Sequence, residues 1–411
     1  MKSNQFRSFI SALCSIFLVF SCNGGGGGGG KLAGGGIGGS GVISSGRITA
    51  FGSVEVNGTM FDTSNAEIII NGVEVGVGDD FIPDNLELGM VVTVEGRIED
   101  DESFVADRVV YSANVIGPVE DISDIDATTK EIVVLGQTVI VNVVTLFEGT
   151  DFNALTEDDV VAVSGYFDDN GVIRATFLEK TGDITSVLEF EVTGFVENLD
   201  RDLKTFMING LRIDYSAISN ILPEGIPADD QFVEVQGELD AGELLAEEIE
   251  LADELGGEDG DEVEIMGFVT EIISESDIIK FKIGNQEVHV DSDPDVVIYV
   301  DGEPGDIKPG QLLEAEGSLV DGILVAVEIE FWEPDQIEVE GIIDQVRFID
   351  DFPEFTLEDR EDQVVQTDND TEFDGIDKEE IEPGINIEVK GVPQDIEQSV
   401  IKADKVSFEI D

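Results

Sequence analysis

The residues best equipped for chemistry in this sequence are aspartates gathered in two short segments. One segment alternates aspartate with other residues over positions 291–295, and the other holds three aspartates between positions 368 and 374. Oxygen ligands at this density are what Ca²⁺ and other hard cations prefer. The sequence therefore indicates calcium as a candidate cofactor, and the candidate ligands are Asp291, Asp293, Asp295, Asp368, Asp370 and Asp374.

A solvated surface explains the same aspartates more simply. Neither segment fits the twelve-residue EF-hand, because Val296 and Phe373 stand where its glycine belongs. The chain has 92 Asp and Glu residues, so acidic turns are expected throughout it. These aspartates therefore fit either solvated turns, the simpler interpretation, or a metal site.

The residues that most enzymes need are scarce. His289 is the single histidine, and strand alternation places it on a polar face, opposite Val288 and Val290. Since a general base needs a positioned partner, we interpret His289 as a solvated strand residue. A pair of carboxylates could hydrolyse a glycoside, but among 92 acids close pairs are expected in any fold. We therefore predict no catalytic residues, and a hydrolase is only a third alternative.

The first residues indicate export. Lys2 and Arg7 precede an apolar stretch over residues 9–20, which is too short to span a bilayer and typical of a signal peptide. The stretch ends in Phe20-Ser21-Cys22, which resembles a bacterial lipobox. We predict a lipoprotein signal peptide over residues 1–21, lipid attachment at Cys22, and a Gly-rich tether over residues 22–45. An ordinary signal peptide that happens to contain a cysteine is the alternative.

Location and redox state follow from that processing. Cleavage would remove Cys14 and leave Cys22 bearing lipid, so no disulfide can form within the chain. The expected location is the bacterial cell envelope, lipid-anchored, with the outer membrane favoured by Asn23 after the cysteine.

Composition excludes several kinds of partner. The 411 residues include 92 acids against 21 Lys and Arg, which gives a formal net charge of −71. Such a surface repels nucleic acid and anionic headgroups, so membrane contact is expected through the lipid alone. Hydrophobic residues still make up 41% of the chain and alternate with the acids, so we expect folded domains and no disordered acidic tail.

One module is repeated five times. A glycine interrupts an alternating strand in each copy, and a second glycine closes a later strand. An alanine follows nine to twelve residues later, always three positions before an aliphatic residue. In copy order, the first glycines are Gly46, Gly117, Gly194, Gly267 and Gly341, the second are Gly96, Gly165, Gly237, Gly317 and Gly391, and the alanines are Ala106, Ala175, Ala246, Ala326 and Ala403.

Period-two alternation and Asn-Gly or Asp-Gly turns dominate every copy, which predicts an all-β fold. Each copy has room for about five strands with a longer excursion before the fourth, and this favours small OB-like Greek-key barrels. A flattened sandwich and extended stacking of the repeats are the alternatives. The predicted modules span residues 46–114, 115–186, 187–256, 257–335 and 336–411, with a Gly-rich acidic linker at 256–261 between the third and fourth.

Contact between modules is expected, because a module of this size is marginal alone and no disulfide staples it. Trp332, the single tryptophan, stands at the end of the fourth module, and we interpret it as an inter-module packing residue.

The first module resembles bacterial lipoproteins that carry the domain of unknown function 5666. The resemblance rests on Cys22 with its glycine run, on the segment Ser45 to Val54, and on Val56-Asn57-Gly58. It implies an envelope compartment and a β-rich repeat, and it carries over no catalytic or binding residue.

The function expected from the sequence is that of an exported, lipid-anchored, non-enzymatic surface interaction or structural protein. A calcium-dependent adhesin or cation-binding protein is the alternative. The partner, whether an envelope protein, a glycan or a cation, is not specified by any motif.

Overall fold

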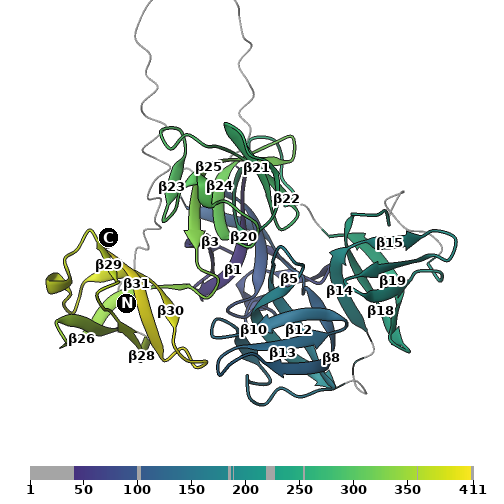
Figure 1. Cartoon of the computed structure of the whole chain (residues 1–411), viewed down its shortest axis with the longest axis horizontal. Coiled ribbons are helices and arrows are strands. Elements are labelled where there is room, and N and C mark those ends of the chain that lie inside the picture. The colour runs from purple at the N-terminus through teal and green to yellow at the C-terminus, as the bar shows by residue number, and fades with distance from the viewer. Residues whose placement is uncertain are drawn as a thin grey trace, which may run out of the picture.

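The computed structural model describes residues 41–99, 103–183, 187, 189–218, 227–252, 255–358 and 360–408. Cys22, the predicted signal peptide and most of the predicted tether lie outside these residues. Five β-barrels are visible in Figure 1, in chain order from purple through blue, teal and green to yellow. Within the described segments the regular elements are strands and three single-turn 3₁₀ helices, and none of them is a helix that could cross a membrane.

The fourth barrel displays the common plan. Its five main strands pair in the order β20–β21–β22–β25–β24 and back to β20, with β22 and β25 parallel and all other pairs antiparallel. This order is that of an OB-fold barrel, so the predicted fold is confirmed. Its elements are β20 (Glu262–Ser274), β21 (Ile278–Ile283), β22 (Gln286–Asp291), β23 (Ile298–Val300), η2 (Pro304–Asp306), β24 (Leu312–Val320) and β25 (Ile323–Trp332).

The other four barrels repeat this plan with small additions. Barrel 1 inserts an extra hairpin, and barrel 3 splits its first strand in two. Barrel 1 comprises β1 (Gly41–Phe51), β2 (Val54–Val56), β3 (Thr59–Asp62), β4 (Glu67–Ile70), β5 (Val73–Val77), η1 (Asp79–Phe81), β6 (Val91–Ile98) and β7 (Phe104–Tyr111). Barrel 2 comprises β8 (Val115–Asp124), β9 (Lys130–Val134), β10 (Gln137–Val141), β11 (Leu146–Glu148), β12 (Asp159–Phe167) and β13 (Ile173–Asp183).

Barrels 3 and 5 complete the array. Barrel 3 comprises β14 (Phe190–Phe195), β15 (Glu197–Asp200), β16 (Thr205–Ile208), β17 (Leu211–Asp214), β18 (Phe232–Asp240) and β19 (Glu243–Leu251). Barrel 5 comprises β26 (Ile337–Ile349), β27 (Phe352–Leu357), β28 (Arg360–Gln366), β29 (Glu372–Asp374), η3 (Lys378–Glu380), β30 (Asn386–Pro393) and β31 (Val400–Phe408).

The predicted tether extends too far. β1 begins at Gly41, so residues 41–45, which the sequence assigned to the tether, belong to a strand. Val42 and Ile43 are buried there, and β1 pairs with β6 on one side and with β20 on the other. The glycine-rich composition hid this strand because its two apolar residues are too few to show a period.

The second glycine and the alanine of each repeat face each other across the last hairpin of the barrel. Gly317 pairs with Ala326, and the same pairing recurs in the other four barrels. The register shifts at each of these glycines, which marks a β-bulge. A Cβ on Gly317 would lie 2.1 Å from the carbonyl oxygen of Val325, so only glycine permits this approach.

The first glycine of each repeat lies under a side chain of the strand 2–strand 3 hairpin. A Cβ at Gly117 would lie 2.5 Å from Cβ of Leu135, and one at Gly267 would lie 2.7 Å from Cγ2 of Ile283. The recurring anchors are therefore the close-approach points of one barrel geometry.

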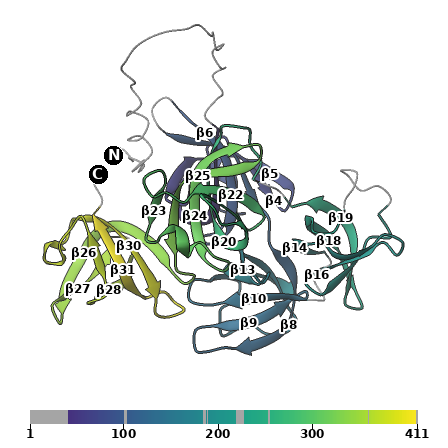
Figure 2. The same cartoon turned by 45° about the horizontal axis from the view of Figure 1, so that its top comes forward.

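Neighbouring barrels share sheets. β1 of barrel 1 pairs parallel with β20 of barrel 4, and β8 of barrel 2 pairs antiparallel with β14 of barrel 3. Barrel 5 keeps a six-stranded sheet of its own. Figure 2 shows barrel 5, in yellow, beside barrels 2 and 4, while barrel 3 lies on the far side of the molecule. Contact between the modules, expected from their small size, is confirmed.

Candidate functional site

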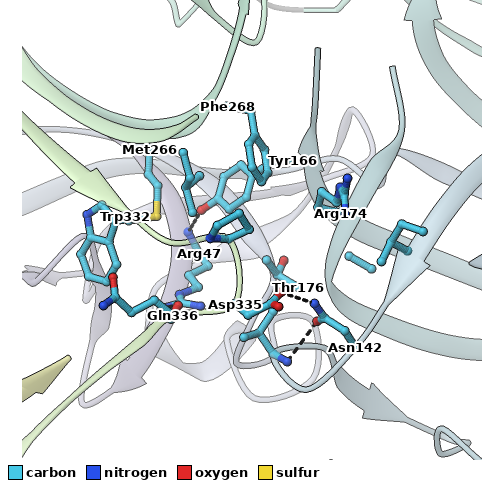
Figure 3. A pocket seen from close by; sticks show the side chains of 15 residues that line it. Arg47, Asn142, Tyr166, Arg174, Thr176, Met266, Phe268, Trp332, Asp335 and Gln336 are labelled. Atoms are coloured by element: carbon cyan, nitrogen blue, oxygen red, sulfur yellow. Dashed lines mark hydrogen bonds between the residues drawn. The ribbon is translucent and has the colours of Figure 1, made fainter. Parts of the chain in front are cut away.

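Barrels 1, 2 and 4 and the segment entering barrel 5 meet around a narrow cavity of about 20 Å³ (Figure 3). That volume admits about one water molecule, so the junction is packed rather than open to a substrate. Trp332 is 5% exposed and packs with Met266, Phe268 and Leu312 of barrel 4 and with Tyr166 of barrel 2. The interpretation of Trp332 as an inter-module packing residue is confirmed.

Arg47 of β1 reaches across this junction. Its backbone N–H donates to the Tyr166 hydroxyl at 3.0 Å, and its guanidinium donates to the carbonyl oxygen of Gln336 at 3.4 Å. Burial lowers the pKa of Arg47, while electrostatic interactions with Tyr166, Glu338 and Glu314 oppose that shift. Arg47 therefore connects barrels 1 and 2 with the segment that enters barrel 5. The acidic groups near it offset only part of the cost of burying its positive charge.

A group of outward-facing glutamates lies where barrel 5 meets barrels 1 and 4; Glu340 is exposed and the others are half-buried. Their chain neighbours, such as Ala315 and Val339, face the barrel cores, so alternation sends the carboxylates outward. Here the outer face of one barrel lies partly against another barrel, so these side chains have less contact with water. We call these residues the joint carboxylates: Glu264, Glu314 and Glu316 of barrel 4, and Glu338, Glu340 and Glu388 of barrel 5.

Glu264 and Glu314 lie on the paired strands β20 and β24, and each carboxyl group affects the pKa of the other. The Ser44 hydroxyl also donates to Oε2 of Glu264 at 3.2 Å. Burial is the main cause that raises the pKa of Glu264 to about 8, and burial raises the pKa of Glu314 well above its ordinary value. Burial therefore favours the neutral form of both carboxyl groups.

Within the described segments, one group of three carboxylates comes close enough to hold a metal ion. Oxygens of Glu338, Glu340 and Glu388 all lie within 4.8 Å of one another. Burial, with the charges of Glu388, Glu314 and Glu340, raises the pKa of Glu338 well above its usual range, and burial raises the pKa of Glu340 to about 7. The repulsion in this group can be relieved either by a proton or by a cation.

Lys390 is the cation buried beside these acids. Its side chain is 8% exposed, forms an ion pair with Glu330, and lies 3.6 Å from Glu338. Its ammonium also lies 4.2 Å from the centre of the Trp332 ring. Burial lowers the pKa of Lys390 to about 8. Lys390 therefore joins β30 of barrel 5 to β25 of barrel 4.

A polar hollow of about 490 Å³ opens next to this joint. Acids dominate its lining, with Lys390 and Lys405 as the basic residues. Lys405 lies 3.4 Å from Asp301, and this ion pair links barrel 5 to barrel 4 across the hollow.

The six predicted metal ligands lie in two separate turns. In the first, Oδ1 of Asp291 accepts the N–H of Asp293, and Oδ1 of Asp293 accepts the N–H of Asp295. These bonds stabilise the turn and direct carboxylate oxygens to backbone donors. None of the three belongs to the close carboxylate group described above. Calcium binding by this loop stays a prediction.

The second turn is partly neutralised by a lysine. Asp368 pairs with Lys402 at 3.1 Å and accepts the N–H of Asp370, and the second of these contacts is the main cause that lowers the pKa of Asp368. Asp374 stands at the end of β29 and belongs to no close carboxylate group in the described segments. Calcium binding here also stays a prediction.

The position predicted for His289 is confirmed. Val288 and Val290 are buried in the barrel 4 core, and His289 faces the other way. Its Nε2 lies 2.6 Å from Oε1 of Glu287, two residues before it on the same face. Cys22 lies outside the described residues.

Sequence reasoning missed the joint carboxylates and Arg47. The alternation that assigned Glu338 and Glu340 to an outer face was correct, but an outer face was taken to mean solvent. The position of Arg47 could have indicated a special role, because it is a basic residue directly after the first repeated glycine in a chain with few basic residues.

Comparison with known proteins gives one strong match. A family model described as a domain of unknown function (DUF5666) matches residues 40–110, 116–179, 193–250, 266–330 and 340–407. Among solved structures, "drosophila Unr CSD456" is similar at 13% sequence identity with a TM-score of 0.13, covering 55% of this chain and 98% of that one. A search of curated proteins gave no match.

Proposed function

Because the chain belongs to the DUF5666 family and carries five copies of that domain, we propose that it is a non-enzymatic structural or interaction protein of the bacterial cell envelope. The observation that carries the proposal is the direct contact between the barrels, two pairs of which share a sheet. Shared strand pairing joins barrel 1 to barrel 4 and barrel 2 to barrel 3. Such an array presents several similar surfaces at fixed spacing, as a scaffold or an attachment protein requires.

The tip of the first hairpin in each barrel supports an interaction role. Each tip exposes a large apolar side chain at or beside the turn, in a chain whose surface is mostly acidic. Single exposed apolar residues are common, but here the first hairpin of every barrel has one, before the turn in some copies and in or after it in others. The exposed residues are Phe51, Ile125, Leu203, Ile278 and Phe348.

Cross-linking in intact cells tests this role. A photoreactive residue placed at Leu203, which is 64% exposed, should give a discrete cross-linked product in the envelope. The same residue at Glu247, exposed on a strand away from the tip, is the matched control. Equal cross-linking from both positions would contradict a role for the hairpin tips.

Lipid anchoring at Cys22 is part of the proposal and has its own test. The wild-type chain should fractionate with the outer membrane, and a Cys22→Ala chain should leave it. A Cys22→Ala protein that remains in the membrane fraction would contradict the lipid anchor while leaving the interaction role untouched.

A divalent-cation-dependent interaction protein is the second candidate. It is favoured by the close approach of Glu338, Glu340 and Glu388, whose charges a cation such as calcium could neutralise. The test is thermal unfolding in CaCl₂ and in NaCl at matched ionic strength. Saturable stabilisation by calcium alone supports this candidate, and superimposed curves refute it.

The protein used for that titration should keep all of β1. A chain starting at Ser44 would lose Val42 and Ile43 from the core, so the chain from Asn23 onward is the appropriate material. A hydrolase with a carboxylate pair is the third alternative, and the hollow of about 490 Å³ beside barrel 5 is where its substrate would be sought.

A further inference from the structure

Barrel 1 carries a strand, β5, beyond the common plan. Its β4 takes the place that β23 has in barrel 4, since each pairs parallel with the last strand of its barrel. The chain then turns at Asn71-Gly72 and adds β5, which pairs with β4 and ends the 13-stranded sheet. Figure 2 labels β4 and β5 at the side of barrel 1. In the part of the chain that the structure describes, no strand pairs with the other edge of β5.

The hairpin that carries β5 is fixed firmly to the barrel. β4 pairs along its whole length with β7, and Ile68 in its middle is fully buried. At the turn, the backbone N–H of Asn71 donates to the carbonyl oxygen of Tyr111 at 2.8 Å, and its side-chain oxygen accepts the N–H of Ala113 at 3.0 Å. A partner therefore meets an edge that is already in strand conformation, so little free energy is lost in ordering it.

β5 lacks most of the features that keep the edge of a sheet from pairing. Natural edge strands are very short, carry charges or proline, or are twisted by a bulge. The edge strands β11, β23 and β29 have three residues each, and β15 has an acid at each end. β5 has five residues, three of them valine, and its guards are one glutamate and the bulge where its register with β4 shifts. Of the strands described that pair on one side only, β5 is therefore the best suited to receive an added strand.

The side chains along β5 offer apolar contact to such a strand. Val73 is 63% exposed and Val77 is 49% exposed, while Val75 packs against the core of barrel 1. The exposed ring of Phe81 covers the backbone at Gly76, where a Cβ would lie 2.3 Å from Cε1 of the ring. An extended segment laid along β5 therefore buries apolar side chains while its backbone pairs with the strand.

Charge determines which kind of segment fits this edge. Residues 67–81 contain four acids and neither Lys nor Arg. Glu74, in the middle of β5, is exposed, and so are Asp79 and Asp80 directly after it. A second copy of the chain would bring the same acids and another net charge of −71 to the interface, and the two copies would repel each other. A segment in which Lys or Arg alternates with apolar residues complements both the acids and the valines.

We propose that β5 is a docking edge for a basic, extended segment of another protein, which joins barrel 1 by β-strand addition. Apolar side chains of the bound segment contact Val73 and Val77, and its basic side chains lie near Glu74 and the two aspartates that follow β5. The docking edge is separate from the hairpin tips. It depends neither on those tips nor on the envelope location, so either can fail without the other.

Fluorescence anisotropy of a labelled peptide, measured with the chain from Asn23 onward, tests this edge. The probe is the peptide Lys-Val-Lys-Val-Lys-Val, acetylated and amidated at its ends. It should bind saturably, and hydrogen exchange of the β5 amides should slow in the complex. The same peptide with L-Lys alternating with D-Val has equal charge but cannot form a regular strand along β5, so it should bind at least about tenfold more weakly. Failure of the first peptide to bind, equal binding of the two, or slowed exchange only outside β5 would overturn the proposal.

Two double variants with the same change of charge locate the site. Val73→Lys with Val77→Lys removes the apolar contacts and places lysines that repel a basic strand, so the affinity for the peptide should fall at least about tenfold. Val296→Lys with Val325→Lys is the matched control, since both of these valines are exposed on barrel 4, and it should bind the peptide as the wild type does. If both double variants weaken binding equally, the net charge of the protein holds the peptide and the docking edge is wrong.

Two further measurements keep the test decisive. If the lysines unfold barrel 1, Val73→Thr with Val77→Thr takes their place, because threonine keeps the strand propensity and leaves the charge unchanged. This variant should also weaken binding of the peptide, and an unchanged affinity counts against the proposal. Sedimentation of the wild type without peptide examines the other occupant. A monomer supports the basic partner, whereas a dimer that the lysine variant separates would assign β5 to a second copy and overturn it.

Discussion

Replacing Gly317 by alanine tests whether the repeated bulge glycine is a steric requirement. Gly317 lies in β24 opposite Ala326, and the register of the two strands shifts at this point. A Cβ there would lie 2.1 Å from the carbonyl oxygen of Val325, whereas ordinary contact begins at 3.4 Å. The two strands must therefore separate by about 1 Å, a shift of the overpacking kind.

The cost can be worked from what that separation breaks. Overpacking strain amounts to about 1–3 kcal/mol, and each ladder hydrogen bond weakened adds about 0.5–1.5 kcal/mol. We expect Gly317→Ala to lower the free energy of unfolding of barrel 4 by about 2–4 kcal/mol. With a urea slope of about 2 kcal/mol/M, the midpoint should fall by about 1–2 M.

Urea unfolding followed by Trp332 fluorescence measures this barrel, because Trp332 ends β25, the strand that pairs with β24. Gly305→Ala in the same barrel is the matched control, since a Cβ at Gly305 meets nothing within 4 Å. Its midpoint should stay near that of the wild type. If the two variants unfold at the same urea concentration, close approach at the bulge is not the reason for the repeated glycine.

Three other predictions concern buried charge and turn strain. Lys390→Met should destabilise barrel 5 by about 3 kcal/mol at pH 7 in thermal unfolding, because Lys390 is charged there and the nearby carboxylates lose their cation. The loss should be smaller at pH 5, where more of those acids are protonated, and an equal loss at both pH values would contradict this. Glu191 is 3% exposed, and burial raises its pKa to about 9, so the free energy of unfolding of the wild type should fall as pH rises from 5 to 9. Glu191→Gln should flatten this dependence of stability on pH, and an unchanged dependence would show that Glu191 is not its source. Asp350 and Asp351 both have positive φ in the two-residue turn after β26, a conformation that strains residues other than glycine and asparagine. Replacing them with Asn-Gly should raise the free energy of unfolding, measured in urea, by about 1 kcal/mol. A lower free energy of unfolding would show that this turn is not strained.

The barrel itself could be predicted from the sequence because its constraints are local. The alternation around Val288 to Val290 set which side chains enter the core, and the Asp321-Gly322 turn set a hairpin. The two repeated glycines proved to be close-approach points within one barrel. Ala246, the repeated alanine of the third copy, lies in β19 (Glu243–Leu251), so the repeat also accounts for this acidic and leucine-rich strand.

The joint could not be predicted because its partners are distant in sequence. Ser44 contacts Glu264 across 220 positions, and Arg47 contacts Gln336 across 289. Nothing in the alternation of β26 distinguishes a carboxylate facing water from one facing another barrel. The start of β1 was missed for a similar reason, since its burial depends on β20, which is more than 200 residues away.

The parallel pairing of β1 with β20 has a consequence for the order in which the chain can fold. As synthesis proceeds from the N-terminus, barrel 1 can close on itself through β6, but the backbone edge of Val42 to Ser45 has no strand beside it until residues 262–265 exist. Contacts of such sequence separation form slowly, and an open strand edge invites wrong pairing in the meantime. A chain truncated after barrel 3 should therefore aggregate through barrel 1, so the five copies are not interchangeable beads and cannot be shortened freely from the C-terminal end.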